Sequence, residues 1–247
     1  MNKLEINNLC KSFDGNQVLN DVSFKAADGE FVAVMGQSGC GKSTLLYCVS
    51  GMDSPTSGEI LFDGRKMLSL SEKETERLRL KRMGFIFQKA NFLKNLSVAD
   101  NIVFPAFQLG EKSRNDIRKT AEELMQRLGI LSVADHDIRQ VSGGQLQRAA
   151  ICRAMINKPE ILFGDEPTGA LNSSATREVM DIISGINGDG TTVMLVTHDS
   201  NVAARADRVI YLEDGQIKDI LSLGKFTPES REARERQIRY WLEKMKF

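Results

Sequence analysis

The sequence predicts an α/β fold: a mostly parallel β-sheet with helices on both faces, an antiparallel β subdomain at the N-terminus and an inserted α-helical subdomain. Three patterns predict it. Apolar and polar residues alternate over 3–35, a mainly helical pattern covers about 91–155, and short apolar runs alternate with helical segments over 161–220. Because the carboxyl ends of parallel strands meet at one edge, that edge is expected to hold the ligand.

Length and composition restrict the class of protein. The chain has 247 residues, enough for one large domain or a core plus a subdomain, with 33 basic and 33 acidic side chains and a pI near 6.8. This balance does not favour a protein that binds polyanions through net charge. No signal-peptide pattern and no apolar run of the ~20 residues needed to span a bilayer occurs, so we expect a cytosolic chain.

A glycine-rich stretch between an apolar run (31–35) and a helical run (45–49) predicts a phosphate-binding loop. Its glycines allow the backbone N–H groups to point inward, and the helix start adds a positive dipole end. Lys42 can reach the β and γ phosphates of a nucleotide, and the Ser43 hydroxyl can ligate Mg²⁺. The alternative is a glycine-rich turn without a ligand. The stretch consists of Gly36, Gln37, Ser38, Gly39, Cys40, Gly41, Lys42, Ser43 and Thr44.

The four cysteines are scattered without metal-ligand spacing, so we expect free thiols. Cys40 differs from the other cysteines because the helix dipole and Lys42 should favour its thiolate. We therefore expect alkylation of Cys40 that ATP slows.

In the N-terminal part, Asp-Gly turn signals separate apolar segments that predict strands. Phe13 lies in the first turn region; it is either an edge residue of the core or a ring that stacks on a base. A Ser-x-x-Glu capping box at Ser71 predicts a solvated helix over 72–82, whose basic end offers the alternative of a membrane contact. The predicted antiparallel strands are 4–9, 18–24 and 30–35, and a further strand is 58–64.

From residue 85 onward the order of elements predicts the core and its insertion. The C-terminal tail, 225–247, is predicted to be an amphipathic helix with Thr227 as N-cap; its apolar face packs on the chain's own core or, alternatively, on a partner. Predicted strands are 85–88, 161–164, 192–196, 208–212 and 216–220, and predicted helices are 98–107, 114–128, 145–155, 175–186 and 201–206.

Two further clusters carry chemistry. The run 161–164 delivers Asp165 and Glu166 to a strand end, where one carboxylate can hold Mg²⁺ and the next can activate water. A Ser-Gly-Gly turn at a helix start supplies backbone donors for a second anion. Since the first loop already cradles the phosphates, the second site is expected to serve the γ phosphate bound by another copy of the chain. This second site comprises Ser142, Gly143, Gly144 and Gln145.

Over residues 2–222 the sequence resembles the ATP-binding cassette (ABC) family. Val141 replaces the commonest signature leucine, and Asn172 stands where much of the family has Asp. The motifs that carry the resemblance are the Walker A loop Gly36–Thr44, the glutamine loop Gln88, the signature Val141–Gln145, the Walker B strand Ile161–Asp165, the catalytic Glu166 and the switch His198.

The resemblance implies a RecA-like P-loop NTPase domain over 1–224, with ATP and Mg²⁺ bound. It implies that Phe13 stacks on adenine, that Gln88 contacts Mg²⁺ or water and senses a permease, and that His198 holds the γ phosphate. The implied catalytic set is Glu166, His198, Gln88 and Lys42, and the implied metal ligands are Ser43, Gln88 and Asp165.

Resemblance is greatest to the branch that serves macrolide export, lipoprotein release and peptide-antibiotic resistance. It implies a cassette homodimer on the cytoplasmic face of the membrane that drives a permease, exporting peptides, antibiotics or lipid-like molecules. The permease contact is expected near Gln88, Asn91, Phe92 and Leu93. One alternative is a mechanical ATPase that regulates a membrane or cell-wall partner without transport. A cassette acting on nucleic acid would need coiled coils or a second cassette, so no nucleic-acid partner is expected.

Overall fold

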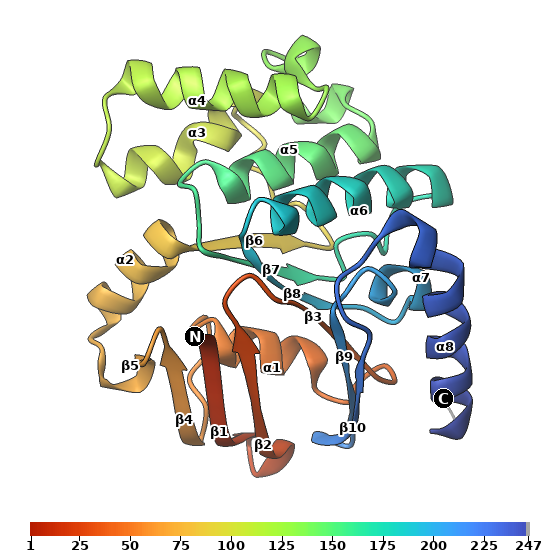
Figure 1. Cartoon of the computed structure of the whole chain (residues 1–247). Coiled ribbons are helices and arrows are strands. Elements are labelled where there is room, and N and C mark those ends of the chain that lie inside the picture. Colours follow the sequence, from red (N-terminus) through yellow and green to blue (C-terminus); the bar gives the residue numbers. More distant parts are fainter. Residues whose placement is uncertain (246–247) are drawn as a thin grey trace. The chain divides into compact units, whose positions relative to one another are not determined.

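The computed structural model describes residues 1–245, so positions 246 and 247 of the predicted tail lie outside the description (Figure 1). The chain forms two compact units. Unit 1 combines Met1–Ser71 with the segment from Asn187 onward, and unit 2 is Glu72–Ile186. Among the described residues, no helix combines the length and apolar character needed to cross a bilayer. The bounds of about 91–155 for the inserted helical subdomain, expected from the sequence, remain a prediction.

Unit 1 contains the predicted antiparallel β subdomain. The turn between its first two strands has Asp14 and Gly15 at φ 47° and 84°, the left-handed pair that a two-residue hairpin requires. The strands run further than predicted because their backbone pairing continues through irregular positions. In the order β2-β1-β4-β5 the sheet contains β1 (Asn2–Phe13), β2 (Asn16–Ala27), β4 (Ser57–Phe62) and β5 (Arg65–Lys66).

The strand at 31–35 is β3 (Phe31–Met35), and its predicted antiparallel pairing is wrong. It pairs in parallel with β8 (Thr192–Val196) and β9 (Arg208–Glu213), whereas β10 (Gln216–Ser222) pairs antiparallel with β9. Every residue of β3 is buried, as expected of a parallel strand covered on both faces, where polar residues do not alternate with apolar ones.

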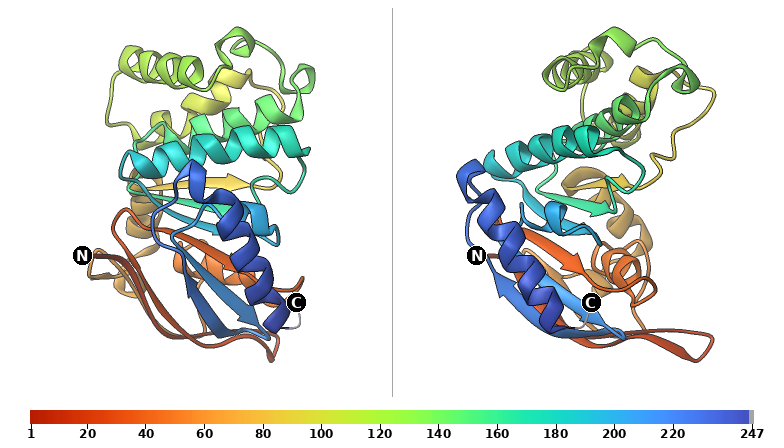
Figure 2. Two further views of the ribbon diagram at one scale, coloured as in Figure 1. Left: turned by 45° about the vertical axis from the view of Figure 1, so that its right-hand side comes forward. Right: turned by 90° about the vertical axis from the view of Figure 1, so that its right-hand side faces the viewer.

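The helices of unit 1 are α1 (Lys42–Val49), α7 (Ser200–Ala203) and α8 (Arg231–Lys244), with short helices η1 (Met67–Ser69) and η4 (Pro228–Ser230). Helix α8 lies along its own unit (Figure 2), and the residues of its apolar face are buried, as predicted. The Trp241 ring meets Tyr211 edge-on at 6.0 Å between centroids, and its Nε1 donates a hydrogen bond of 2.7 Å to Asp219.

Replacing Trp241 with alanine is expected to lower the free energy of unfolding by about 3–5 kcal/mol, because it removes a buried ring and leaves a cavity. Urea unfolding followed by circular dichroism measures this. Tyr240 on the same helix is 62% exposed, so Tyr240→Ala is the control and should change stability little. Equal losses in the two variants would contradict a docked α8.

Unit 2 pairs β6 (Met83–Phe87) in parallel with β7 (Ile161–Asp165), and Phe87 lies opposite Asp165. This register places Gln88 and Glu166 at neighbouring strand ends. Helices α3, α4 and α5 pack on one another (Figure 1), and Ser97 and Ser113 cap the first two. The helices are α2 (Glu72–Arg82), α3 (Val98–Leu109), α4 (Arg114–Arg127), α5 (Gly143–Met155) and α6 (Ser173–Gly188), with short helices η2 (Leu131–Val133) and η3 (Ile138–Gln140).

Candidate functional site

In unit 1, the predicted phosphate loop joins the end of β3 to the start of α1. A Cβ atom on Gly36 would lie 2.1 Å from the carbonyl oxygen of Leu212, so only glycine fits where the loop leaves the sheet. The loop thus passes directly over β9 before turning into the helix. Close packing against a neighbouring strand and freedom to cradle a ligand both require the small residue.

Lys42 folds back over this loop. It is 7% exposed, and its Nζ donates hydrogen bonds to the carbonyls of Gly36 (2.9 Å) and Gln37 (2.7 Å). Within α1, which lies wholly in the described part of the chain, no side chain caps the N-terminus and the first turn has no acidic residue. Backbone donors and a cation therefore meet at one place, which suits a nucleotide phosphate.

The expectation that the loop favours the Cys40 thiolate is wrong, whereas slower alkylation in the presence of ATP remains a prediction. The Cys40 thiol is 8% exposed, and burial raises its pKa although Lys42 Nζ lies 3.9 Å from Sγ and opposes that shift. The thiolate is the minor form at neutral pH because the loss of water outweighs the nearby charge.

Alkylation of Cys40 by iodoacetamide is expected to be slower at pH 7.5 than that of the partly exposed Cys10. The rate should continue to rise with pH beyond the ordinary thiol range before it levels off, since the pKa is raised. Mass spectrometry of labelled peptides provides the measurement. Faster labelling of Cys40 than of Cys10 at pH 7.5 would contradict the buried environment.

Phe13 is the last residue of β1 rather than part of a turn, and its side chain is 45% exposed. The ammonium of Lys11 lies 4.6 Å from the ring centroid, and Asp53 and the Ser54 carbonyl hold that ammonium. The ring is thus supported by a positioned cation while much of it faces solvent, which suits stacking better than the core-edge alternative.

His198 follows β8 in unit 1 and is exposed. The turn after it is well ordered by hydrogen bonds: Asp199 N donates to Thr197 Oγ1 at 3.0 Å, and Asn201 N donates to Asp199 Oδ1 at 2.7 Å. Asp199 thereby caps α7, and the histidine is presented at a defined point between strand and helix.

In unit 2, Gln88 and Glu166 come together around Gly169. A Cβ atom on Gly169 would lie 2.8 Å from Gln88 Nε2 and 3.3 Å from Glu166 Oε2. Glu166 has φ 45°, a left-handed conformation that non-glycine residues rarely adopt and that often marks a functional position. Asp165 ends β7 just before it. The predicted carboxylates and the glutamine therefore share one strand edge.

The Ser-Gly-Gly turn begins α5 with a capping box. Ser142 Oγ accepts a hydrogen bond from Gln145 N at 3.3 Å, and Ser142 N donates to Gln145 Oε1 at 3.1 Å. The Ser-x-x-Gln spacing is the sequence signal for this box. Gln145 thus shapes the helix start that presents the backbone donors.

This helix start lies against the segment that leads into α6. A Cβ atom on Gly144 would be 3.5 Å from the Cβ of Ala175. Asn172 Oδ1 accepts a hydrogen bond from Ala175 N at 2.9 Å, which is a capping contact that an aspartate also makes. The Asn172 departure therefore keeps the helix cap while removing a charge.

The expected permease-contact segment is organised by a residue whose role the sequence analysis missed. Asn101 on α3 is 2% exposed; it accepts from Leu93 N at 2.7 Å and donates to the carbonyls of Leu93, Leu96 and Ser97. A polar residue within the apolar run of α3 was the available signal. Through these bonds Leu93 is held with 48% of its surface exposed.

Comparison with known proteins assigns the family. The ABC transporter family model matches residues 19–169, and the chain belongs to this family. It is 42% identical to an uncharacterized ABC transporter ATP-binding protein of Methanocaldococcus jannaschii over 204 residues, 83% of this chain and 91% of that protein. It is 41% identical over 212 residues to the macrolide export ATP-binding/permease protein MacB of Campylobacter jejuni, covering 86% of this chain but 33% of that protein.

Solved structures agree with this assignment. A dimeric structure of a post-hydrolysis state of the ATP-binding cassette MJ0796 bound to ADP and Pi matches with TM-score 0.84 and 36% identity, covering 90% of this chain and all of that chain. The predicted P-loop NTPase fold and ATPase class are confirmed: the chain is an ATP-binding ABC ATPase. The chain spans about a third of the length of the MacB relatives.

Proposed function

We propose that two copies of this chain close around two ATP·Mg²⁺, each site using the phosphate loop of one copy and the Ser142–Gln145 turn of the other. The carrying observation is that the chain presents a second helix start with backbone donors in addition to a loop that already suits the phosphates of one nucleotide. The dimeric state of the similar cassette MJ0796 supports the same arrangement.

Within each site the residues have separate roles. Lys42 binds the β and γ phosphates together with the N–H groups of residues 36–44, and His198 holds the γ phosphate. Glu166 orients and deprotonates the attacking water. Ser43, Asp165 and Gln88 would hold Mg²⁺, and the ion would supply charge neutralisation on the phosphate oxygens. The hydroxyl, carboxylate and amide oxygens of these residues suit such a hard cation.

A mixing experiment tests the shared site. Lys42→Ala and Ser142→Arg chains should each be inactive alone, because each lacks one half of both sites. Mixed together, they form heterodimers in which one site keeps an intact Lys42 and an intact Ser142, so ATPase activity should return. A mixture that stays inactive while heterodimers are detected by crosslinking would contradict sites shared between copies.

In this proposal the membrane partner is a permease, and ATP hydrolysis by the cassette dimer at the cytoplasmic face of the membrane drives the permease to export peptides, antibiotics or lipid-like molecules. The names of the MacB relatives, which join cassette and permease in one protein, support this proposal. The contact involves Gln88, Asn91, Phe92 and Leu93. Copurification with a membrane protein encoded by a neighbouring gene, followed by ATPase assays with candidate substrates, tests this proposal. Stimulation of the ATPase activity without transport of a substrate would favour mechanical regulation instead.

Replacement of Phe13 by alanine is expected to weaken ATP binding by about 1–3 kcal/mol, because the half-exposed ring stacks on adenine. Titration with a fluorescent ATP analogue measures the affinity. Leu68, which is 51% exposed in the same unit, supplies the control variant Leu68→Ala. Unchanged affinity in the Phe13 variant would assign the ring to packing alone.

A further inference from the structure

Two side chains of α5 bind main-chain carbonyls at the end of β6 and in the segment that follows it. Arg153 Nη2 donates to the carbonyl of Ala90 at 2.5 Å and its Nη1 donates to that of Asn91 at 3.3 Å. The guanidinium carbon also lies 4.6 Å from the centroid of the Phe92 ring. One turn and a half earlier on the helix, Gln147, 4% exposed, donates to the Phe87 carbonyl at 3.3 Å.

Arg153 is a partly buried cation. Burial lowers its pKa to about 10, so it remains a cation at neutral pH. Within residues 1–245 no carboxylate pairs with it; its partners are main-chain carbonyls and an aromatic face. Removing a cation from water costs free energy, which charge-assisted hydrogen bonds and stacking on the ring offset.

The segment turns at Asn91, whose φ of 47° lies in the left-handed region that asparagine adopts more readily than most residues with a side chain. Its carbonyl is one of the two that Arg153 binds, and the far end of the segment is fixed by Asn101 through Leu93. The conformation of 88–93 is therefore determined from α5 on one side and from α3 on the other.

We propose that Arg153 is a positioning residue, which holds residues 88–93 in the conformation needed for coupling to the membrane partner. The ring of Phe92 stacks on the Arg153 guanidinium. Within the proposed contact set, Asn91 and Leu93 are exposed and meet the permease directly, whereas Phe92, of intermediate exposure, supports them through its ring contact with Arg153. Since α5 begins at the Ser142 turn, one helix links that turn to the permease-contact segment. The coupling role rests on the proposed function.

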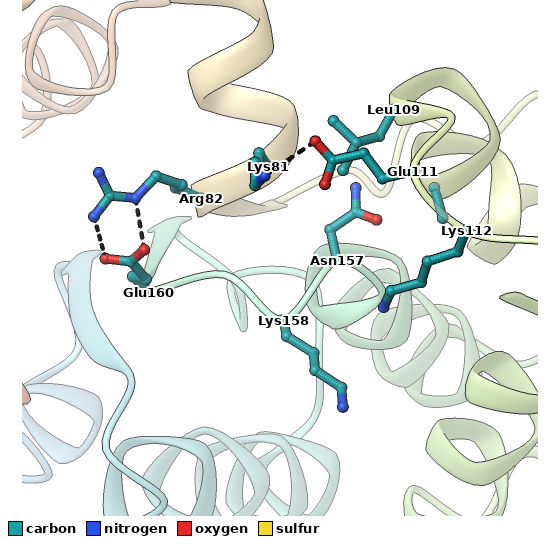
Figure 3. Close-up of a pocket in the computed structure, with 9 residues that line it drawn as sticks. Lys81, Arg82, Leu109, Glu111, Lys112, Asn157, Lys158 and Glu160 are labelled. Atoms are coloured by element: carbon teal, nitrogen blue, oxygen red, sulfur yellow. Dashed lines mark hydrogen bonds and ion pairs between the residues drawn. The ribbon is translucent and has the colours of Figure 1, made fainter. Parts of the chain in front are cut away.

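Arg82 offers a matched control in the same unit. Its guanidinium forms a two-pronged ion pair with Glu160 beside a pocket of about 290 Å³ (Figure 3), with Nε donating at 2.6 Å. Arg82 directly precedes β6, whereas Arg153 holds the residues that follow that strand. Arg82→Lys and Arg153→Lys therefore remove the same planar fork, keep the charge, and differ in which end of β6 they affect.

The test compares hydrogen exchange and kinetics in these variants of the full chain. In Arg153→Lys, exchange over 88–93, where the Leu93 amide donates to Asn101, should accelerate at least about tenfold, since lysine cannot bind both carbonyls or stack as the planar group does. Arg82→Lys should leave that segment unchanged. With the copurified membrane partner, Arg153→Lys should lower the stimulated kcat about tenfold and leave the KM for ATP within about twofold, as loss of positioning rather than of nucleotide binding predicts.

Phe92→Leu gives a second route if Arg153→Lys folds poorly. It keeps an apolar side chain but removes the ring from the guanidinium, and it should accelerate exchange over 88–93 in the same direction. Unchanged exchange in both variants, or unchanged stimulation with accelerated exchange, would overturn the proposal. If no membrane partner stimulates the ATPase activity of the wild-type chain, the proposed function is rejected instead. The exchange measurements use the isolated chain, so their outcome does not depend on that result.

Discussion

A Glu166→Gln chain is expected to bind ATP, to hydrolyse it ~10²–10⁴-fold more slowly than wild type, and to accumulate as an ATP-bound dimer. The amide keeps the shape of the carboxylate at the strand end beside Gly169 but cannot accept the proton of the attacking water. In the proposed closed dimer, donors from both copies continue to hold the intact γ phosphate, so the dimer is expected to persist when hydrolysis fails.

Light scattering with and without ATP, together with single-turnover hydrolysis, measures this effect. Glu123 on α4 is exposed, so Glu123→Gln is the control for removal of one negative charge and should behave as wild type. A Glu166→Gln chain that remains monomeric in ATP, or that turns over normally, would contradict both the assigned base and the closed dimer.

Lys42→Ala is expected to lower ATPase activity at least ~10³-fold, equivalent to about 4 kcal/mol of barrier. The ammonium is held over the phosphate loop by the carbonyls of Gly36 and Gln37, so it is positioned before the nucleotide arrives. Alanine removes both the charge that is expected to meet the β and γ phosphates and the bonds that shape the loop.

Steady-state phosphate release and ATP titration separate the two effects of this substitution. Lys73 on α2 is exposed, and Lys73→Ala should leave both measurements unchanged. Thermal unfolding completes the comparison, because a buried lysine bonded to its own loop also contributes to folding. Substantial ATPase activity in folded Lys42→Ala would show that another cation neutralises the phosphates.

Much of the fold and of the candidate site follows from local sequence patterns. Glycines, Lys42 and a serine between a strand and a helix define a phosphate loop by spacing alone, and the spacing of Ile238, Trp241 and Leu242 predicts the buried face of α8. The helices α3, α4 and α5 are each preceded by a serine, a typical N-cap residue; these serines are Ser97, Ser113 and Ser142. Such signals depend only on residues close together in the sequence, so the sequence alone is enough to recognise them.

Strand pairing and the burial of side chains depend on the tertiary structure instead. The sequence by itself determined the order of the elements, the phosphate loop and the identity of Glu166 and Gln88 as strand-end residues. Only the tertiary structure decided that β3 pairs in parallel, that Cys40 is buried enough for its pKa to rise, and that Arg153 grips 88–93. Each of these depends on residues distant in sequence, because strand partners, loss of water and long-range hydrogen bonds exist only once the chain has folded.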